Sequence, residues 1–493
     1  MSGSRRDFLR ISGAGAAFLA MAGACSRPDQ RASNDLAALD AVETAARINS
    51  GDLSAGEAVE AAIERAERVE PRLNAIVEKT YDRARDAAAG AQGLWAGVPT
   101  FVKDLDDVTG APTRFGSRAY PDYLGRAQTP LVNAYLGLGV VSLGKSTTPE
   151  FGLSATTEPV STGATRNPWN TDYSPGGSSG GAAALVAAGV VPVAHASDGG
   201  GSIRIPASCC GNVGLKVSRT RFPQSRPSAG PIALSVHGVQ TRTVRDTAAV
   251  LAAMELPPEE SGLPPVGLVS APSSKRLKMA LVTKGLRDAP VNGDVMAALE
   301  SVAALCADLG HTVEPFDLPL DPGLEDDFLL YWAAIAGGAV SFWESQSALA
   351  RDEAYFEKFT LGLAGLHEAN QADLAGAVGR LQEAAAAIAG IFTQYDAILS
   401  PVVAAPPPEI GYLDGALDYA TLKERLFDYV QFPSFYNVAG NPAISLPLSM
   451  SSGGLPIGAM FAAAEGDERT LLELSYELEE ASPWAGRRPA VFG

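Results

Sequence analysis

The sequence predicts an α/β protein, and three stretches of different texture carry that prediction. Residues 35–95 place apolar side chains at helical spacing. Residues 97–250 alternate short apolar runs with turns rich in glycine and serine, which is typical of repeated strands, tight turns and helices. Residues 276–395 contain a further strand–helix–strand unit and then a long helical stretch. Strands and helices mixed along one chain in this way favour a sheet covered by helices.

The composition is that of an ordinary globular protein, with 46% hydrophobic and 19% charged residues among 493. The net charge of −18 repels phosphate backbones, so we expect no nucleic-acid partner. The four cysteines form no CxxC pair and only four histidines accompany them, so we expect no metal site. Cys209 and Cys210 are expected in the core rather than in a disulfide. No segment after the N-terminus reaches about 18 uninterrupted apolar residues, which predicts no transmembrane span.

The N-terminus resembles a twin-arginine signal peptide over residues 1–25, followed by a polar tether over residues 26–34. Arg5 and Arg6 precede an apolar stretch that is too short to span a bilayer. The stretch ends at Ala24 and Cys25, which leaves two routes open: cleavage after Ala24, or a lipobox with a lipid on Cys25. Both predict export to the periplasm, the second with membrane anchoring as a lipoprotein. A plain amphipathic helix is the structural alternative.

The remaining chain, residues 35–493, divides into regions of different pattern. In the first helical region, Ser54 precedes Glu57 by three residues, which is the spacing of a capping box. Residues 97–250 contain three apolar runs that predict strands, at Val98–Val102, Val140–Leu143 and Val190–Ala194.

Residues 255–275 contain five prolines and few long apolar runs, so they resemble an exposed linker. Residues 276–395 form a more variable α/β and helical part. Within it the pattern predicts a strand at Met279–Val282, a helix at Asp294–Leu309 and a strand at Thr312–Pro315.

Residues 323–395 are then predicted to be largely helical. Residues 396–493 return to the texture of the core region. They predict short buried strands at Ala397–Leu399 and Ala443–Pro447 and a final helix at Glu468–Leu478.

Two loops rich in glycine and serine carry the candidate chemistry, Ser174–Gly181 and Asp198–Arg204. Three consecutive glycines, residues 199–201, let the backbone turn sharply and direct several N–H groups to one point. Acyl transfer needs such a point for the oxyanion of its tetrahedral intermediate. Ser202 follows the glycines directly and is a candidate nucleophile. The structural alternative is a pair of flexible surface loops.

A nucleophilic serine needs a base, and Lys103 is the candidate. A lysine can serve as base when burial penalises its charged form. Lys103 ends the apolar stretch Gly97–Lys103, which would carry it inward. The alternative is an exposed lysine at a strand end.

The stretch Gly97–Asp104, the loop Gly176–Gly181 and residues 198–214 together resemble the amidase signature family. The spacing of 24 residues between Ser178 and Ser202 is also typical of that family. The resemblance extends to residues 396–401 and 440–458. It implies a three-layer α/β/α fold with a central mixed sheet and helical insertions.

The resemblance also implies the site residues. Lys103 would be the base, Ser178 the proton relay next to a cis peptide bond, and Ser202 the nucleophile. The backbone N–H groups of the residues after Asp198 would form the oxyanion hole, and no cofactor would be needed. The full expected set is Lys103, Ser178 and Ser202 for catalysis, Gly199, Gly200, Gly201 and Ser202 for the oxyanion hole, and Ser179, Asp198 and Arg204 around them.

Further segments, such as residues 156–159 and 163–170, resemble the 6-aminohexanoate cyclic-dimer hydrolase branch. One departure concerns the oxyanion loop, because Gly199 stands where the family usually has Thr or Ile. We interpret this as a looser loop. The segments least like the common scaffold, residues 115–160, 323–370 and 405–435, are expected to line the substrate pocket, and their aromatic and leucine content favours a bulky apolar group.

The resemblance therefore predicts an amidase that hydrolyses linear or cyclic amides through an acyl-enzyme, as a monomer or homodimer. An esterase or carbamate hydrolase with the same triad is one alternative. A catalytically inactive binding protein on the same fold is the other.

Two further motifs predict different functions. Gly139–Ser146 matches a phosphate-binding loop, but Pro149 disfavours the helix that such a loop must open. Gly177–Gly181 matches a nucleophile elbow with Ser179 as nucleophile, which would need a downstream acid and histidine. His195 is expected to be a buried histidine with satisfied hydrogen bonds, or to help shape the site floor near Asp198.

Overall fold

The computed structural model describes residues 36–493 apart from residues 126, 225–229, 288, 348 and 350. The predicted signal peptide, with its two predicted routes at Cys25, and the predicted tether lie outside the described residues. The described strands are β1 (Ile76–Lys79), β2 (Pro99–Lys103), β3 (Val141–Ser146), β4 (Val193–Asp198), β5 (Val213–Lys216), β6 (Val236–Thr241), β7 (Lys278–Leu281), β8 (Thr312–Pro315), β9 (Ala397–Pro401), β10 (Ala443–Met450) and β11 (Pro456–Ala462).

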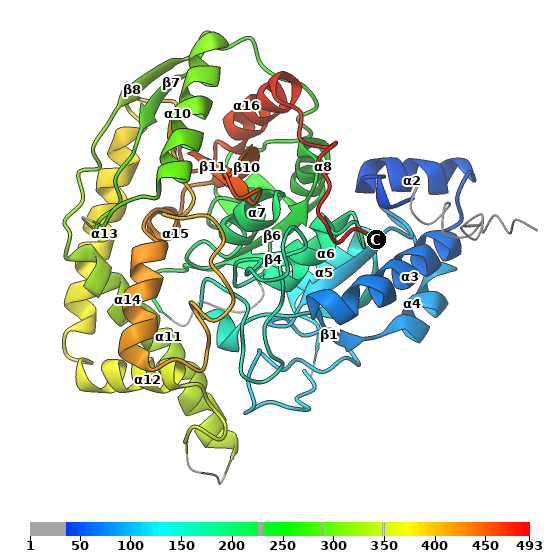
Figure 1. The fold of residues 1–493 in the computed structure, drawn as a ribbon, viewed down its shortest axis with the longest axis horizontal. Coiled ribbons are helices and arrows are strands. Elements are labelled where there is room, and N and C mark those ends of the chain that lie inside the picture. Colours follow the sequence, from blue (N-terminus) through cyan, green and yellow to red (C-terminus); the bar gives the residue numbers. More distant parts are fainter. Residues whose placement is uncertain (1–35, 126, 225–229, 288, 348, 350) are drawn as a thin grey trace, which may run out of the picture.

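The helices fall into an N-terminal group, a group that covers the sheets, and a group between β8 and β10 (Figure 1). They are α2 (Ala41–Ser50), α3 (Ala55–Leu73), α4 (Tyr81–Ala88), α5 (Pro130–Gly137), η1 (Glu150–Gly152), α6 (Gly180–Ala187), α7 (Arg204–Cys210), α8 (Val244–Met254), α9 (Pro258–Ser261), α10 (Gly293–Asp308), α11 (Leu324–Gln346), α12 (Lys358–Ala369), α13 (Leu374–Ile391), α14 (Tyr419–Tyr429), α15 (Ser434–Ala439) and α16 (Glu468–Ala481).

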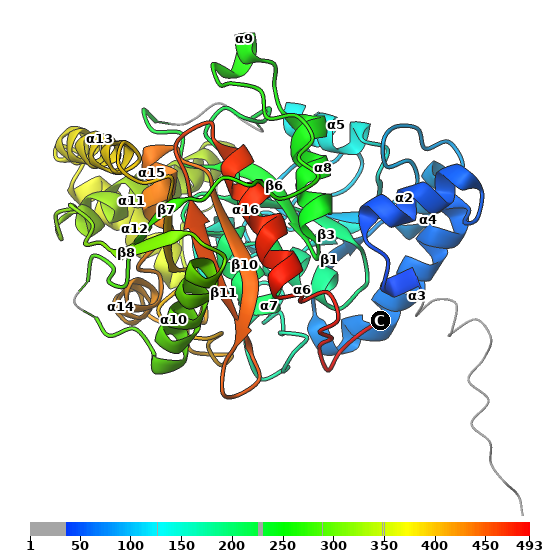
Figure 2. The ribbon, with the colours of Figure 1, turned by 90° about the horizontal axis from the view of Figure 1, so that it is seen from above.

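The large sheet has the strand order β4-β6-β5-β10-β11-β9-β7-β8 in the described residues. It is mixed, because β10 pairs antiparallel with β5 and β11 while β7 pairs parallel with β8 and β9. Helix α16 lies across β10 and β11 on one face (Figure 2). The predicted α/β fold with a central mixed sheet is confirmed.

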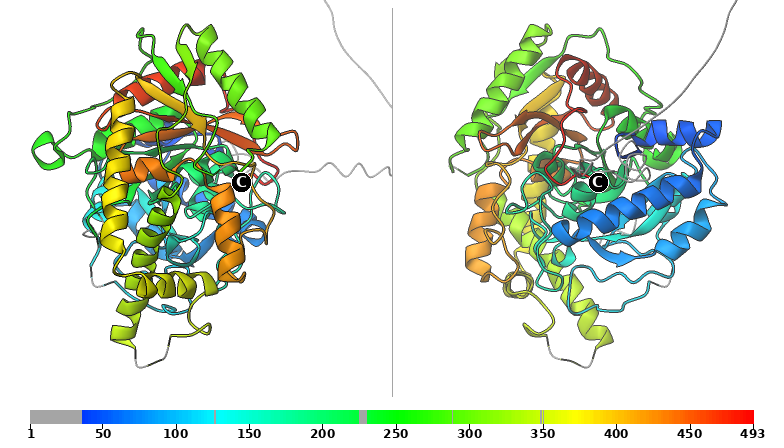
Figure 3. Two further views of the ribbon diagram at one scale, coloured as in Figure 1. Left: turned by 90° about the vertical axis from the view of Figure 1, so that its left-hand side faces the viewer. Right: turned by 45° about the vertical axis from the view of Figure 1, so that its right-hand side comes forward.

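Side chains of the sheet alternate between two apolar layers, as expected for strands buried on both faces. Met279 and Leu399 pack with α8, α10 and α16 on one face. Ala280 and Ile398 point to the other face, where they join residues of α11, α12 and α14. The helices of residues 324–429 form a layer of their own there (Figure 3). Two helical layers around one sheet give the three-layer arrangement that the resemblance implies.

The small sheet has the order β1-β3-β2, and it carries Lys103. β2 runs parallel to β3, with Lys103 opposite Ser146. β1 contradicts the expectation of helices throughout residues 35–95. It consists of only four residues, and its backbone partners in β3 lie far along the chain, so no local periodicity reveals it.

Most other elements lie within a few residues of their predicted places. The capping box at Ser54 and Glu57 is present at the start of α3. The predicted strand at Val190–Ala194 occurs later, as β4, so that it ends on Asp198.

The segment 255–275 has no strand; it contains α9, and Val266 and Val269 are buried in the core. The division into regions at 97–250, 255–275, 276–395 and 396–493 stays a prediction. Within the described residues, no helix is both long and apolar enough to cross a membrane.

Candidate active site

Lys103 reaches the centre of the site from the end of β2. Its side chain is fully buried, and its Nζ donates hydrogen bonds to Ser178 Oγ at 2.8 Å and to Ser197 Oγ at 3.1 Å. Two hydroxyl groups thus accept hydrogen bonds from the buried amine.

The surroundings of Lys103 favour its neutral form. Burial lowers the pKa of the Lys103 ammonium to about 7, although Asp106 and Asp198 partly oppose the shift. An amine with a pKa near 7 is neutral in a large share of molecules at neutral pH, so it can accept a proton.

The loop that carries Ser178 is packed tightly, and the peptide bond between Gly177 and Ser178 is cis. A Cβ atom at Gly177 would lie 2.5 Å from the Thr156 carbonyl oxygen, so only glycine fits there. Ser179 Oγ donates to the Ser197 carbonyl at 3.2 Å, which ties the loop to β4. The flexible-loop alternative therefore does not describe this segment.

Asp198 organises the loop that leads to Ser202. Its two carboxylate oxygens accept the N–H groups of Gly201 at 2.8 Å and Ile203 at 3.1 Å. Arg204 donates to both oxygens at 2.9 Å, and Asn437 Nδ2 donates at the same distance. Burial alone would raise the pKa of Asp198, but Arg204 holds it well below its usual range. The ionised carboxylate therefore holds the turn in front of Ser202.

These contacts change the expected oxyanion hole. The N–H of Gly201 donates to Asp198, so it is not free to bind an oxyanion. Gly200 and Ser202 line the adjacent cavity. Among the described residues, no hydrogen bond joins Ser178 to Ser202; such catalytic contacts often form only with substrate bound.

Gly199 is packed, in contrast to the looser loop expected from the sequence. A Cβ atom there would lie 3.0 Å from Ser235 Oγ and 3.3 Å from the Trp332 ring. Trp332 stacks on Phe328, with ring centroids 5.7 Å apart, and its Nε1 donates to the Leu153 carbonyl at 3.4 Å. The glycine at 199 thus makes room for an aromatic wall of the site.

We predict that Gly199→Thr displaces Trp332 and lowers the free energy of unfolding by about 1–3 kcal/mol, because the added side chain overfills a packed place. It should also raise KM for bulky substrates, since Trp332 lines the cavity. Thermal unfolding and steady-state kinetics measure both effects.

Gly200→Ala is the matched control, because a Cβ at Gly200 would meet Phe328 Cζ at an ordinary 3.4 Å. Equal stability of Gly199→Thr and the unmodified protein would contradict the packing argument.

A cavity opens at Ser202, which is 8% exposed. Its walls are almost entirely apolar. Most of the lining residues come from the three segments that the sequence predicts for the pocket, and the others come from the glycine loop and the start of α7. The lining residues are Gly152, Leu153, Ser154, Ala155, Gly200, Ser202, Ile205, Phe328, Leu329, Trp332, Phe359, Leu426, Phe427, Val430 and Ser434. The cavity therefore suits an apolar group bound to the carbonyl that Ser202 would attack.

Asp106, His195 and His237 lie behind Lys103, with one potential metal-ligand atom each within 4.8 Å of the others. The backbone N–H of Lys103 donates to His195 Nδ1 at 3.3 Å. Nδ1 is therefore the acceptor of a neutral His195 ring, and the ring proton lies on Nε2, which faces His237 Nδ1 at 3.3 Å. Burial lowers the pKa of His195 to about 3, which keeps the ring neutral. A metal ion bound here would need a lone pair on His195 Nε2, which carries the ring proton. The arrangement therefore fits a structural role, in which His195 holds the backbone of Lys103 through a hydrogen bond.

The competing motifs have structural roles. Lys145, in the sequence that matches a phosphate-binding loop, lies within β3 and donates to Asp104 Oδ1 at 3.2 Å and to the Asp106 carbonyl at 2.8 Å. Ser179 bonds to the backbone of β4 rather than to a histidine. Cys209 and Cys210 are free and buried, as predicted.

Sequence reasoning missed three residues of the site. Ser197 precedes Asp198 and could have been found as the strand position that shares a face with His195. Asn437 and Trp332 had no such signal, because both come from helices far along the chain.

Comparison with known proteins places these features in context. The family described as Amidase matches residues 57–472. The chain is 46% identical to AmiC of Mycobacterium tuberculosis, which is named as an amidase, over 91% of this chain and 95% of that protein. It is 34% identical to 6-aminohexanoate-cyclic-dimer hydrolase of Paenarthrobacter ureafaciens, over 92% and 96%.

Solved structures agree with the sequence comparisons. A 6-aminohexanoate cyclic dimer hydrolase complexed with its substrate superposes with a TM-score of 0.83 and 31% identity, covering 93% of this chain and all of that chain. A bacterial aryl acylamidase of the amidase signature enzymes has a TM-score of 0.82 and 28% identity, covering 91% and 99%. The similarity therefore spans the described site and the surrounding fold.

Proposed function

Because this chain belongs to the amidase family, we propose that its amide hydrolysis proceeds through Ser202, Ser178 and Lys103. The observation that supports this most is the buried Lys103 Nζ at 2.8 Å from Ser178 Oγ. An amine in that position, with its pKa lowered to about 7 by burial, is suited to draw a proton from a hydroxyl.

In the first half of the reaction, neutral Lys103 takes the proton of Ser178 while Ser178 takes that of Ser202. Ser202 Oγ then forms a bond to the amide carbonyl carbon. The carbonyl oxygen becomes an oxyanion, which the N–H groups of Gly199, Gly200 and Ser202 would stabilise. Gly201 is left out because its N–H already binds Asp198.

In the second half, the same relay returns a proton to the nitrogen of the leaving amine as the carbon–nitrogen bond breaks. Ser202 is left as an ester of the acyl group. Water then attacks that ester while the relay accepts its proton. The bond from the acyl carbon to Ser202 Oγ breaks, the relay returns the proton to Ser202 Oγ, and the free acid leaves. Asp198 and Arg204 take no proton in this scheme; they hold the backbone in front of Ser202.

The proposal is tested with a matched set of p-nitrophenyl substrates: an anilide, an ester and a carbamate that share one apolar acyl portion. We expect hydrolysis of the anilide, with ester hydrolysis also present because the same nucleophile attacks both. Trapping of the acyl group on Ser202, detected by mass spectrometry after acid quenching, would support the covalent intermediate. Hydrolysis of the ester and carbamate without the anilide would contradict an amidase.

The place of action is a separate proposal. We propose export by the twin-arginine route, on the pattern at Arg5 and Arg6, with Cys25 as either the first residue after cleavage or a lipid anchor. The amide substrate would then be met in the periplasm.

A further inference from the structure

Two apolar walls of the cavity at Ser202 come from helices that are far apart along the chain. Phe328 belongs to α11, and Phe427 belongs to α14. An acidic residue precedes each ring by three positions: Glu325 on α11 and Glu424 on α14. Side chains three positions apart share one face of a helix. A contact that fixes these two carboxylates therefore also fixes the two rings.

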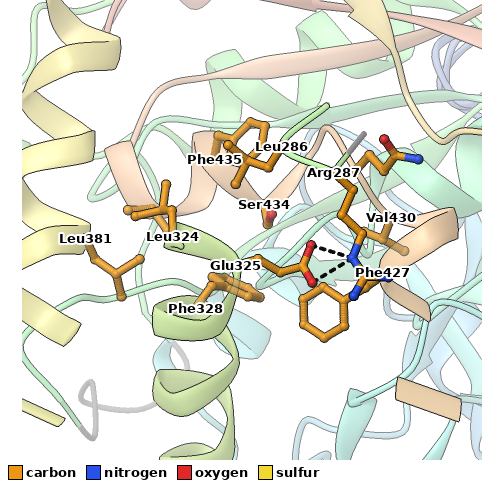
Figure 4. Close-up of a pocket in the computed structure, with 12 residues that line it drawn as sticks. Leu286, Arg287, Leu324, Glu325, Phe328, Leu381, Phe427, Val430, Ser434 and Phe435 are labelled. Atoms are coloured by element: carbon orange, nitrogen blue, oxygen red, sulfur yellow. Dashed lines mark hydrogen bonds and ion pairs between the residues drawn. The ribbon is translucent and has the colours of Figure 1, made fainter. Parts of the chain in front are cut away.

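Arg287 binds carboxylates of both helices at once. Its Nε donates to the two carboxylate oxygens of Glu325, at 2.8 and 2.9 Å. Its Nη1 donates to Glu424 at 3.1 Å and to Asp428 at 2.8 Å. Figure 4 shows the Glu325 carboxylate facing Arg287, and the guanidinium carbon lies 5.7 Å from the centroid of the Phe427 ring. One guanidinium therefore links α11 to α14 beside a wall of the cavity.

The position of Arg287 is fixed from its own segment. The preceding residue, Leu286, packs against an apolar cluster that contains Leu324 of α11 and Leu381 of α13. The side chain of Arg287 is 26% exposed and that of Glu325 is 17% exposed, so solvent ions screen this pair less than a fully exposed pair. An isolated exposed ion pair contributes little to stability, but a guanidinium that binds both oxygens of a carboxylate also fixes its geometry.

Without this arginine, three carboxylates of like charge would lie close together. Their mutual repulsion would be strongest at Glu325, which is mostly buried. The rest of each helix would stay packed, because Leu329 of α11 and Leu422 and Tyr429 of α14 belong to one core cluster. The fold would therefore persist, while the spacing of the two phenylalanine rings would change.

We propose that Arg287 is a positioning residue for substrate binding: it sets the spacing of Phe328 and Phe427, and thereby the fit of the cavity to an apolar group. The inference rests on the proposed function, because it takes Ser202 as the site of the reaction. Arg287 is not among the described residues that line this cavity. Its effect therefore falls on substrate binding through the two rings, and the chemical step is left to the triad.

The test compares the unmodified protein with Arg287→Met on hexanoyl p-nitroanilide, which is apolar on both sides of its amide. The result then does not depend on which side enters the cavity. We expect KM to rise about tenfold, because displaced rings lose part of their contact with the substrate, while kcat stays within about twofold. Raising NaCl from about 0.05 to about 0.5 M should also raise KM of the unmodified protein, but not that of Arg287→Met.

Two further variants separate this bridge from a general loss of structure. Arg287→Lys keeps the charge but lacks the planar fork, so its KM should lie between those of the unmodified protein and Arg287→Met. Glu325→Gln should raise KM when it is introduced alone. It should not raise KM further in Arg287→Met, because both changes break the same contact.

Arg351→Met is the matched control. The Arg351 side chain is 32% exposed and binds both carboxylate oxygens of Glu368, beyond the end of α11 and away from the residues that line the cavity. Its loss removes a similar ion pair, so KM and kcat should both stay within about twofold.

An unchanged KM in Arg287→Met would overturn the inference, as would a fall in kcat alone, an equal rise of KM in Arg351→Met, or additive effects of Arg287→Met and Glu325→Gln. The proposed function is tested separately, because it fails if the unmodified protein does not hydrolyse the anilide. In that case the Kd of hexanoyl p-nitroanilide for Ser202→Ala, with and without Arg287→Met, still tests the cavity. A tenfold weaker Kd is expected, and an equal Kd would overturn the inference.

Discussion

Ser202→Ala is expected to lower kcat/KM for amide hydrolysis by about a thousandfold or more, because no other group can form the covalent bond to the acyl carbon. The fold should be unaffected, since Ser202 Oγ makes no hydrogen bond among the described residues and its backbone is held through Asp198. Initial rates on an apolar p-nitroanilide, with thermal unfolding as a check, give the comparison.

Two other serines serve as controls for Ser202→Ala. Ser154 lines the same cavity, and Ser154→Ala should keep activity within a few-fold. Ser179 is the nucleophile of the competing elbow motif, and its hydroxyl bonds to the Ser197 carbonyl. Full activity of Ser202→Ala together with loss in Ser179→Ala would reverse the assignment of the nucleophile.

Lys103→Met is expected to lower kcat/KM by a factor comparable to that of Ser202→Ala and, unlike that variant, to raise the stability of the fold. It removes the base, so kcat/KM should fall about a thousandfold or more. In the unmodified protein, kcat/KM should rise with pH through an apparent pKa of about 7 and then level off, because only the neutral amine accepts a proton. The variant should lose that pH dependence.

The stability change of Lys103→Met follows from the same pKa. The folded-state pKa, about 7, lies below the ordinary lysine value of 10.5, so the folded protein disfavours the charged amine. Each pKa unit corresponds to about 1.4 kcal/mol, so this cost amounts to several kcal/mol. It is complete below pH 7 and fades as pH rises towards 10.5. The variant should therefore gain most thermal stability near pH 6 and progressively less at higher pH.

Lys145→Met provides the contrast. Lys145 is equally buried, but it is paired with Asp104 at 3.2 Å, so its loss leaves an unpaired buried carboxylate and should lower stability by about 3–5 kcal/mol. A loss of stability at pH 6 in Lys103→Met would show that the ammonium is well accommodated, which would contradict the neutral base.

The candidate residues Ser202 and Lys103 could be predicted because each lies in a short sequence pattern that suggests its role. Three glycines before Ser202 and an apolar strand before Lys103 each fit within ten residues, and the large strands and helices follow from periodicity. Features that depend on distant partners could not be predicted. β1 exists because β3 pairs with it. The N–H of Gly201 is not available to an oxyanion because it donates to the Asp198 carboxylate.

Gly199 illustrates the limit most clearly. From the sequence, a glycine at position 199 suggests a flexible backbone. In the fold, the space that a side chain would occupy there is bounded by Ser235 and Trp332.

The contact between Gly199 and Trp332 also constrains how this enzyme can diverge from its relatives. A branched residue at position 199 is accommodated only after the indole has been replaced by something smaller, so the order of the two substitutions matters. Lineages with the tryptophan should keep the glycine, and those with threonine or isoleucine at 199 should carry a smaller residue at 332. Positions 199 and 332 would then change together in evolution. A change of substrate preference would start with a substitution of Trp332 on α11, and a substitution in the glycine loop would follow it.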